Sequence, residues 1–283
     1  MYLGTISLCS CGGCERSLLL TGEPLVALLS ENNISFSGQL VDRHSISPSD
    51  IVLAAGCVRN SEEIELAREV SRTSRKVIAV GSCAVFGGIP GMASLPDEIA
   101  SGHAVEGLPA LLEGAVPLDS VMDIDYYIPG CPPPPSLILD SLKSVLEGYP
   151  PARSDFTVCA ECRRRTERCE IEWRDHPGAG LAPDACLLSA GHLCLGPVTR
   201  GGCHAVCTGH GSICIGCRGP SDAVLSSELH SMFSDMVRYA ASTAGVREEK
   251  VEKKLQKLLK YMYLFTRRDP VTRHRPREKV PAD

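Results

Sequence analysis

The fold is decided by residues 51–83, which read IVLAAGCVRNSEEIELAREVSRTSRKVIAVGSC. The short apolar runs at residues 51–55 and 76–80 have the length and the β-branched content of buried strands. Between them, residues 60–74 have the apolar spacing of an amphipathic helix, with Asn60 or Ser61 as N-cap and two glutamates in the first turn. This order of strand, helix and strand predicts a parallel βαβ unit.

The same alternation extends over the first 150 residues. We expect further strands over residues 5–8, 34–41 and 124–128, and further helices over residues 15–30, 108–112 and 135–147. Strands that alternate with helices in this way predict a doubly wound parallel sheet in an α/β fold. In such a sheet the carboxyl ends of the strands share one edge, and ligands bind there.

Cysteine is the unusual residue of this chain, with fifteen among 283 residues. Residues 1–8 lack the basic and apolar segments of a secretory signal, so we expect a reducing, cytoplasmic location. In that compartment cysteine clusters indicate metal binding or catalysis rather than disulfides. The net charge of -5 does not favour a nucleic-acid partner, and no apolar run is long enough for direct membrane insertion.

A first set of four cysteines follows the ends of three predicted strands: Cys11, Cys14, Cys83 and Cys131. Their loops read CGGC, GSCAVFGG and PGCPPPP, and glycine and proline there let the backbone approach a metal group closely. We therefore predict one metal site at the shared edge. Two alternatives stay open: a CxxC motif also occurs in redox pairs and zinc sites, and Cys83 and Cys131 are also compatible with small buried apolar residues.

Nine more cysteines lie within residues 157–219, a stretch with no strong apolar periodicity. Eight of them complete two four-thiolate sites: Cys159, Cys162, Cys186, Cys194, Cys203, Cys207, Cys214 and Cys217. Cys169, in the arginine-rich run RRRTERCEI, is the one left out. All-thiolate ligation suits zinc or iron-sulfur clusters. The wide spacing of Cys186, Cys194 and Cys203 favours clusters, because structural zinc sites typically use two close pairs.

The chain divides by composition into four segments. Residues 1–150 form the α/β domain and residues 151–220 form a cysteine-rich domain. Residues 221–266 have the apolar spacing of two amphipathic helices joined near Gly245. The charged, proline-bearing tail of residues 267–283 is expected to be disordered.

The chain resembles the small subunits of nickel-iron hydrogenases, and most closely the methanogen methyl-viologen-reducing type that does not reduce the deazaflavin coenzyme. The motifs that carry the resemblance are CGGCERS, GCVRN, GSCAVFGGIPG, YIPGCPPPP, VCAEC and CLLSAGHLCLGPVTRGGCHAVC followed by CIGCRGP. The resemblance implies a flavodoxin-like sheet, a cysteine-rich iron-sulfur domain and C-terminal helices. It also implies three 4Fe-4S clusters and no catalytic residue in this chain.

The resemblance assigns each cysteine set to one cluster. The proximal cluster, nearest the nickel-iron centre of a separate large subunit, would be held by Cys11, Cys14, Cys83 and Cys131. The distal cluster would be held by Cys159, Cys162, Cys186 and Cys194. The medial cluster would be held by Cys203, Cys207, Cys214 and Cys217. The implied role is electron transfer from hydrogen oxidation to a small iron-sulfur subunit and a flavin-containing heterodisulfide reductase.

Three positions depart from the pattern of this family. Arg16 stands where a glutamate is common, and Ala55 stands where an acidic residue tends to occur. Cys57 replaces a small residue after a strand end and is an alternative ligand of the first site, whereas we interpret Cys9 as a spare thiol. These departures leave a second function open, in which the chain is an electron-transfer adaptor that docks on another dehydrogenase and has no nickel-iron partner. Further alternatives are the gamma subunit of a deazaflavin-reducing hydrogenase, a sulfhydrogenase delta subunit and a zinc-stapled scaffold.

Overall fold

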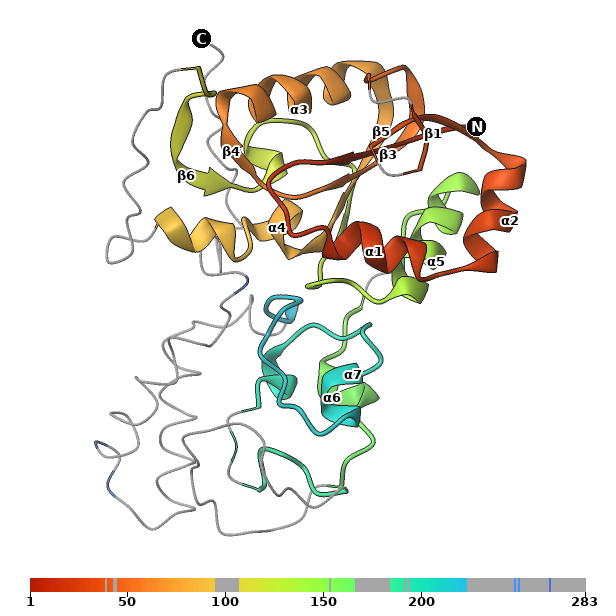
Figure 1. Ribbon diagram of the computed structural model, residues 1–283. Helices are drawn as coiled ribbons and strands as arrows, with labels where there is room; N and C mark the ends of the chain where they lie inside the picture. The colour runs from red at the N-terminus through yellow and green to blue at the C-terminus, as the bar shows by residue number, and fades with distance from the viewer. Residues whose placement is uncertain are drawn as a thin grey trace. The chain divides into compact units, whose positions relative to one another are not determined.

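A computed structural model describes residues 1–38, 40–42, 45–94, 107–152, 154–165, 184–190, 192 and 194–222, together with residues 247, 249 and 265. These residues separate into two compact units (Figure 1). The first comprises the described residues up to 152 together with Phe265, and the second begins at Ser154. Cys169 and the tail of residues 267–283 lie outside the described residues, as does nearly all of the segment expected to form the C-terminal helices. The four-segment division of the chain stays a prediction.

Five parallel strands form the central sheet of the first unit. They are β1 (Tyr2–Ser7), β2 (Asn33–Ser37), β3 (Ser49–Ala55), β5 (Ser74–Val80) and β7 (Tyr126–Ile128). Their order in the sheet is β2-β1-β3-β5-β7, and every neighbouring pair is parallel. This order confirms the flavodoxin-like, doubly wound sheet.

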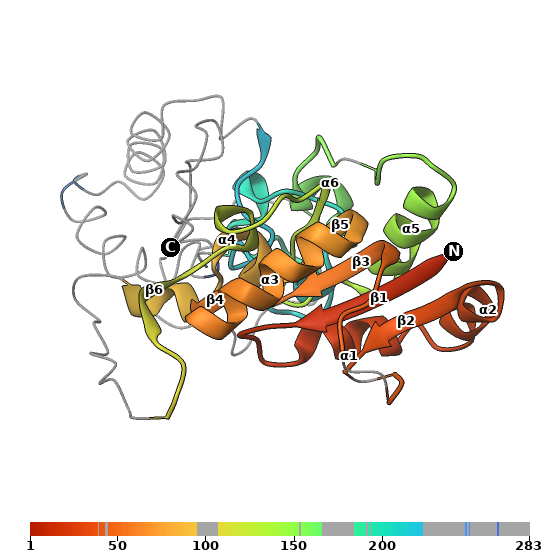
Figure 2. The ribbon, with the colours of Figure 1, turned by 90° about the horizontal axis from the view of Figure 1, so that it is seen from above.

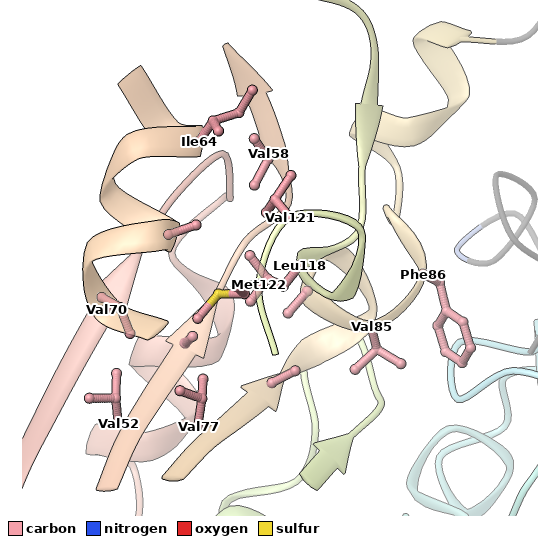
Figure 3. Packing of buried hydrophobic residues seen from close by; sticks show 14 of the residues in the cluster. Val52, Val58, Ile64, Val70, Val77, Val85, Phe86, Leu118, Val121 and Met122 are labelled. Atoms are coloured by element: carbon pink, nitrogen blue, oxygen red, sulfur yellow. The ribbon is translucent and has the colours of Figure 1, made fainter. Parts of the chain in front are cut away.

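Helices cover both faces of this sheet (Figure 2). One face carries α3 (Ser61–Thr73), α4 (Gly81–Phe86) and the 3-10 turn η3 (Leu118–Ser120), and the other carries α1 (Gly13–Leu19), α2 (Glu23–Glu31) and α5 (Pro135–Leu146). Alternate residues of β3 point to opposite faces, so Val52 packs with α3 whereas Ile51 packs with α1, α2 and α5. Figure 3 shows Val52 and Val77 of the sheet beside Val70 of α3.

Helix α3 begins where its sequence predicts. The Asn60 side chain accepts a hydrogen bond of 2.9 Å from the backbone N–H of Glu63, which confirms Asn60 as the N-cap. The Glu63 side chain in turn accepts from the backbone N–H of Arg59 over 2.6 Å. These bonds satisfy two backbone donors at the start of the helix and hold it against β4 (Val58–Asn60).

Two of the helix predictions are wrong. The single helix expected over residues 15–30 is divided into α1 and α2, because Gly22 has a φ of 66° and Pro24 lies in the first turn of α2. The helix expected over residues 108–112 is absent from the described residues 107–112. Instead, Leu111–Val116 forms β6, which pairs antiparallel with β4. Pairing with a distant segment therefore decides the conformation there. The turn η1 (Pro90–Ser94) follows α4.

The second unit has little regular structure. Its described part contains α6 (Val158–Glu161), η4 (Gly196–Val198) and α7 (Val206–Gly209). A small core joins apolar side chains to two buried thiols, and its buried members are Val158, Leu187, Cys194, Leu195, Ala205 and Cys214. Candidate metal ligands thus form part of the packing of this unit.

Candidate metal centres

The first cysteine set lies at the carboxyl edge of the parallel sheet. Cys11 and Cys14 follow β1, Cys83 lies in α4 directly after β5, and Cys131 follows β7. The sheet order brings these segments together although they are up to 120 residues apart along the chain. Cys9 and Cys57 follow β1 and β3 and lie at the same edge.

Electrostatic interactions link the four thiols of the first set. Burial raises the pKa of Cys14, and the negative charges of Glu15, Cys83, Cys131 and Cys11 raise it further. Burial likewise raises the pKa of Cys83 to about 11, with a further contribution from Cys11. Because the charges of Cys11, Cys83 and Cys131 all act on Cys14, the four thiols lie near one another. A bound metal group favours the thiolate form and so relieves this repulsion.

Two glycines leave the space that these thiols occupy. Gly81 has a φ of 91°, and a Cβ at that position would collide with Sγ of Cys14. Gly88 has a φ of 59°, and a Cβ there would lie 2.5 Å from Sγ of Cys83. The glycines of the GSCAVFGG motif therefore have a steric role at the first set, and any side chain would displace a thiol.

Glu15 is the acidic group of the first set. Both of its carboxylate oxygens are buried and have no hydrogen-bond partner among the described residues. Its charge contributes to the raised pKa of both Cys14 and Cys83. Arg16, the residue that departs from the family pattern, is exposed, whereas Ala55 is buried at the end of β3.

Cys9 and Cys57 form a pair of thiols beside the first set. A hydrogen bond from the Cys57 thiol lowers the pKa of Cys9 to about 7, and the same bond raises the pKa of Cys57. Sequence reasoning treated Cys9 as a spare thiol and missed this pairing. The signal was available, because both cysteines come two residues after the ends of the neighbouring strands β1 and β3.

The second set gathers in the cysteine-rich unit. Burial raises the pKa of Cys159 to about 11, and the charges of Cys194, Cys162 and Cys186 raise it further. A Cβ at Gly196 would lie 3.1 Å from Sγ of Cys159 and 3.6 Å from Sγ of Cys194. The structure thus brings together the four cysteines that the resemblance groups as distal ligands.

The third set consists of two pairs of neighbouring thiols, Cys203 with Cys207 and Cys214 with Cys217. The pKa of Cys203 is raised by burial and by the charges of Glu161 and Cys207. The pKa of Cys214 is raised to about 12 by burial, with contributions from Cys194 and Cys217. The backbone N–H of Cys214 also donates to Sγ of Cys194 over 3.3 Å. The second and third sets are therefore neighbours within one unit.

Four thiols in each set are the donors that 4Fe-4S clusters use, so the residues present fit such a group. Within the described ranges, no group of three or more histidine, cysteine, aspartate or glutamate side chains is arranged to hold a metal ion. The role of each cysteine as a ligand stays a prediction. None of the helices in the described part of the chain has the length and apolar character that a membrane crossing requires.

Comparisons with known proteins agree with this architecture. Residues 11–145 match the family described as NADH ubiquinone oxidoreductase, 20 Kd subunit. The G subunit of the vhu F420-non-reducing hydrogenase of Methanococcus voltae is 36% identical over 239 residues, which cover 79% of this chain and 83% of that protein. The delta subunit of sulfhydrogenase 2 of Pyrococcus furiosus is 31% identical over 234 residues, covering 82% of this chain and 91% of that protein.

The fold is also found in a solved structure. A chain of the [NiFeSe] hydrogenase of Desulfovibrio vulgaris Hildenborough superposes with a TM-score of 0.51 at 18% identity, covering 78% of this chain and 94% of that chain. The sheet, its cysteine-lined edge and these relatives define a hydrogenase subunit, and thus part of an oxidoreductase. Within that class, the chain belongs to the family of the F420-non-reducing hydrogenase G subunits.

Proposed function

We propose that this chain is the electron-transfer subunit of a nickel-iron hydrogenase and holds three 4Fe-4S clusters, one in each four-cysteine set. The observation that supports this best is the convergence of the Cys14 thiol with the other three thiols of the first set at the sheet edge. The thiols around Cys159 converge in the same way in the second unit. When bound, such clusters supply one-electron chemistry.

The residues of the chain have defined tasks in this proposal. Cysteine thiolates ligate the clusters, and Gly81, Gly88 and Gly196 leave room for the thiols. Burial and nearby charges such as that of Glu15 set how readily each site accepts negative charge. No acid, base or nucleophile of this chain takes part in hydrogen activation, which belongs to a separate large subunit.

The proposed partners follow from kinship with the F420-non-reducing hydrogenases. They are a nickel-iron large subunit beside the first set, then a small iron-sulfur subunit and a heterodisulfide reductase, all in the cytoplasm. The gamma subunit of a coenzyme F420 hydrogenase and the delta subunit of a sulfhydrogenase are variants of this function among the relatives. Arg16 and Ala55 favour a second candidate, an electron-transfer adaptor that docks on another dehydrogenase.

Metal analysis of the native complex, purified without oxygen, tests the proposal. Beyond the iron of the other subunits, we expect about twelve irons and a matching amount of acid-labile sulfide per copy of this chain, since each of three clusters holds four irons. Nickel in the same complex supports the hydrogenase function. Twelve irons without nickel would favour the adaptor, and zinc without sulfide would exclude both candidates.

A further inference from the structure

We propose that Arg218 holds a buried positive charge against the third cysteine set and thereby raises the reduction potential of the cluster bound there. The inference rests on the proposed function. Arg218 directly follows Cys217 and is only 3% exposed. Its Nε donates a hydrogen bond of 2.8 Å to the carbonyl oxygen of Gly201, two residues before Cys203. The side chain therefore spans the two ends of the set.

The loop before Cys203 leaves room for this guanidinium group. Gly202 has a φ of 95°, and a Cβ there would lie 3.1 Å from a terminal guanidinium nitrogen of Arg218. The same Cβ would lie 2.5 Å from the hydroxyl oxygen of Ser154. The absence of a side chain at Gly202 thus leaves space for both the Ser154 hydroxyl and the guanidinium.

Arg218 is a buried cation beside the third set. Burial lowers the pKa of Arg218, whereas the thiolate charges of Cys203 and Cys217 favour its charged form. Glu161 also faces the set, and its carboxylate accepts a hydrogen bond of 3.2 Å from the backbone N–H of Cys203. Arg164 is a second cation nearby, and its Nε donates to the carbonyl oxygen of Thr208, next to Cys207. Arg200 is a third, and it forms an ion pair of 2.8 Å with Asp222.

A buried cation acts strongly on the redox equilibrium of a neighbouring cluster. Reduction adds one negative charge to the cluster and its thiolates. A positive charge close by in a low-dielectric environment stabilises the reduced form more than the oxidised form. Arginine suits this task because it stays charged at physiological pH. Arg218 is in this sense a positioning and tuning residue that does not ligate the metal.

The test is an EPR-monitored redox titration of the full complex with Arg218→Gln and Arg218→Lys. We expect Arg218→Gln to lower the reduced-to-oxidised ratio of one cluster about tenfold at a fixed potential, which is a downward shift of about 59 mV for one electron. Arg218→Lys, which keeps the charge but loses the Nε hydrogen bond, should stay near the wild-type potential. Equal shifts in both variants would make the role of Arg218 structural and overturn the inference.

Iron content separates failure of this inference from failure of the proposed function. A wild-type complex in which the third set binds no cluster would overturn both. An unchanged potential in an Arg218→Gln complex with its full iron content would overturn the role of Arg218 alone. Arg200→Gln is the matched control and should shift the potential less, because the charge of Arg200 is paired with Asp222. If Arg218→Gln does not assemble, Arg218→Met also removes the charge, and the same downward shift is expected.

Discussion

Cys9 and Cys57 exchange both of their backbone hydrogen bonds, because the N–H of each residue donates to the carbonyl oxygen of the other over 3.0 Å. The Cys57 thiol lies 3.4 Å from the carbonyl oxygen of Cys9 and is also hydrogen-bonded to the Cys9 thiol. Cys57 is fully buried in this arrangement. The pair forms an isolated antiparallel bridge beyond the ends of the parallel strands β1 and β3, and it holds the two loops together beside the first set.

This pairing predicts that Cys57 is not a cluster ligand. Cys57→Ser should leave the iron content of the complex at the wild-type value, since the four cysteines of the first set complete its cluster. Iron analysis and EPR spectra of the purified variant measure this. A loss of about four irons would instead make Cys57 a ligand in place of a member of the first set.

Cys83→Ser should remove about four irons, because it takes one thiolate from the first set. The variant complex should also lose the ability to reduce a viologen dye with hydrogen. The matched control is Cys169→Ser, which should leave iron content unchanged. Similar iron losses in both variants would contradict the assignment of Cys83.

Gly81→Ala should also cost the complex about four irons, because the new methyl group takes the position of Sγ of Cys14. Gly148→Ala is the matched control. It has a similar φ of 89°, but no atom lies within 4 Å of its added Cβ. It should reproduce the backbone strain and keep all of the iron. If both variants lose iron equally, strain alone explains the effect of Gly81→Ala.

Asn60→Ala should lower the free energy of unfolding by about 1 kcal/mol, because the backbone N–H of Glu63 loses its side-chain acceptor. Asn60→Asp keeps an acceptor at the N-cap and should retain most of the stability. Chemical denaturation of the full-length chain, followed by circular dichroism, measures both. A cost of the same size for Asn60→Asp would show that the cap does not act through this bond.

The metal-free chain should lose stability at alkaline pH. Burial raises the pKa of the Cys159 thiol from 9.0 to about 11 in the folded form, so the folded state holds its proton more tightly than the unfolded state. The corresponding stabilisation is complete below about pH 9 and is lost as the pH rises through about 11. Thermal unfolding at a series of pH values checks this, and Cys159→Ser should make the decline less steep.

Part of the fold can be predicted from the sequence because it depends on local patterns of apolar residues. The apolar runs of β3 and β5 and the spacing of α3 identify a βαβ unit. Asn60 identifies the start of its helix. The break at Gly22 and the strand β6 were missed for different reasons. The break depends on one positive φ, and β6 depends on a partner strand more than 50 residues earlier in the chain.

The sequence by itself determined the parallel sheet and the edge at which the first cysteines lie, because hydrophobic periodicity and strand-end position are local properties. Only the tertiary structure decided that Cys57 faces Cys9, 48 residues away, and that Arg218 reaches Gly201 beside the third set. These contacts depend on strand order and on the paths of loops. Such paths follow from the packing of segments far apart in the chain, which local sequence patterns do not encode.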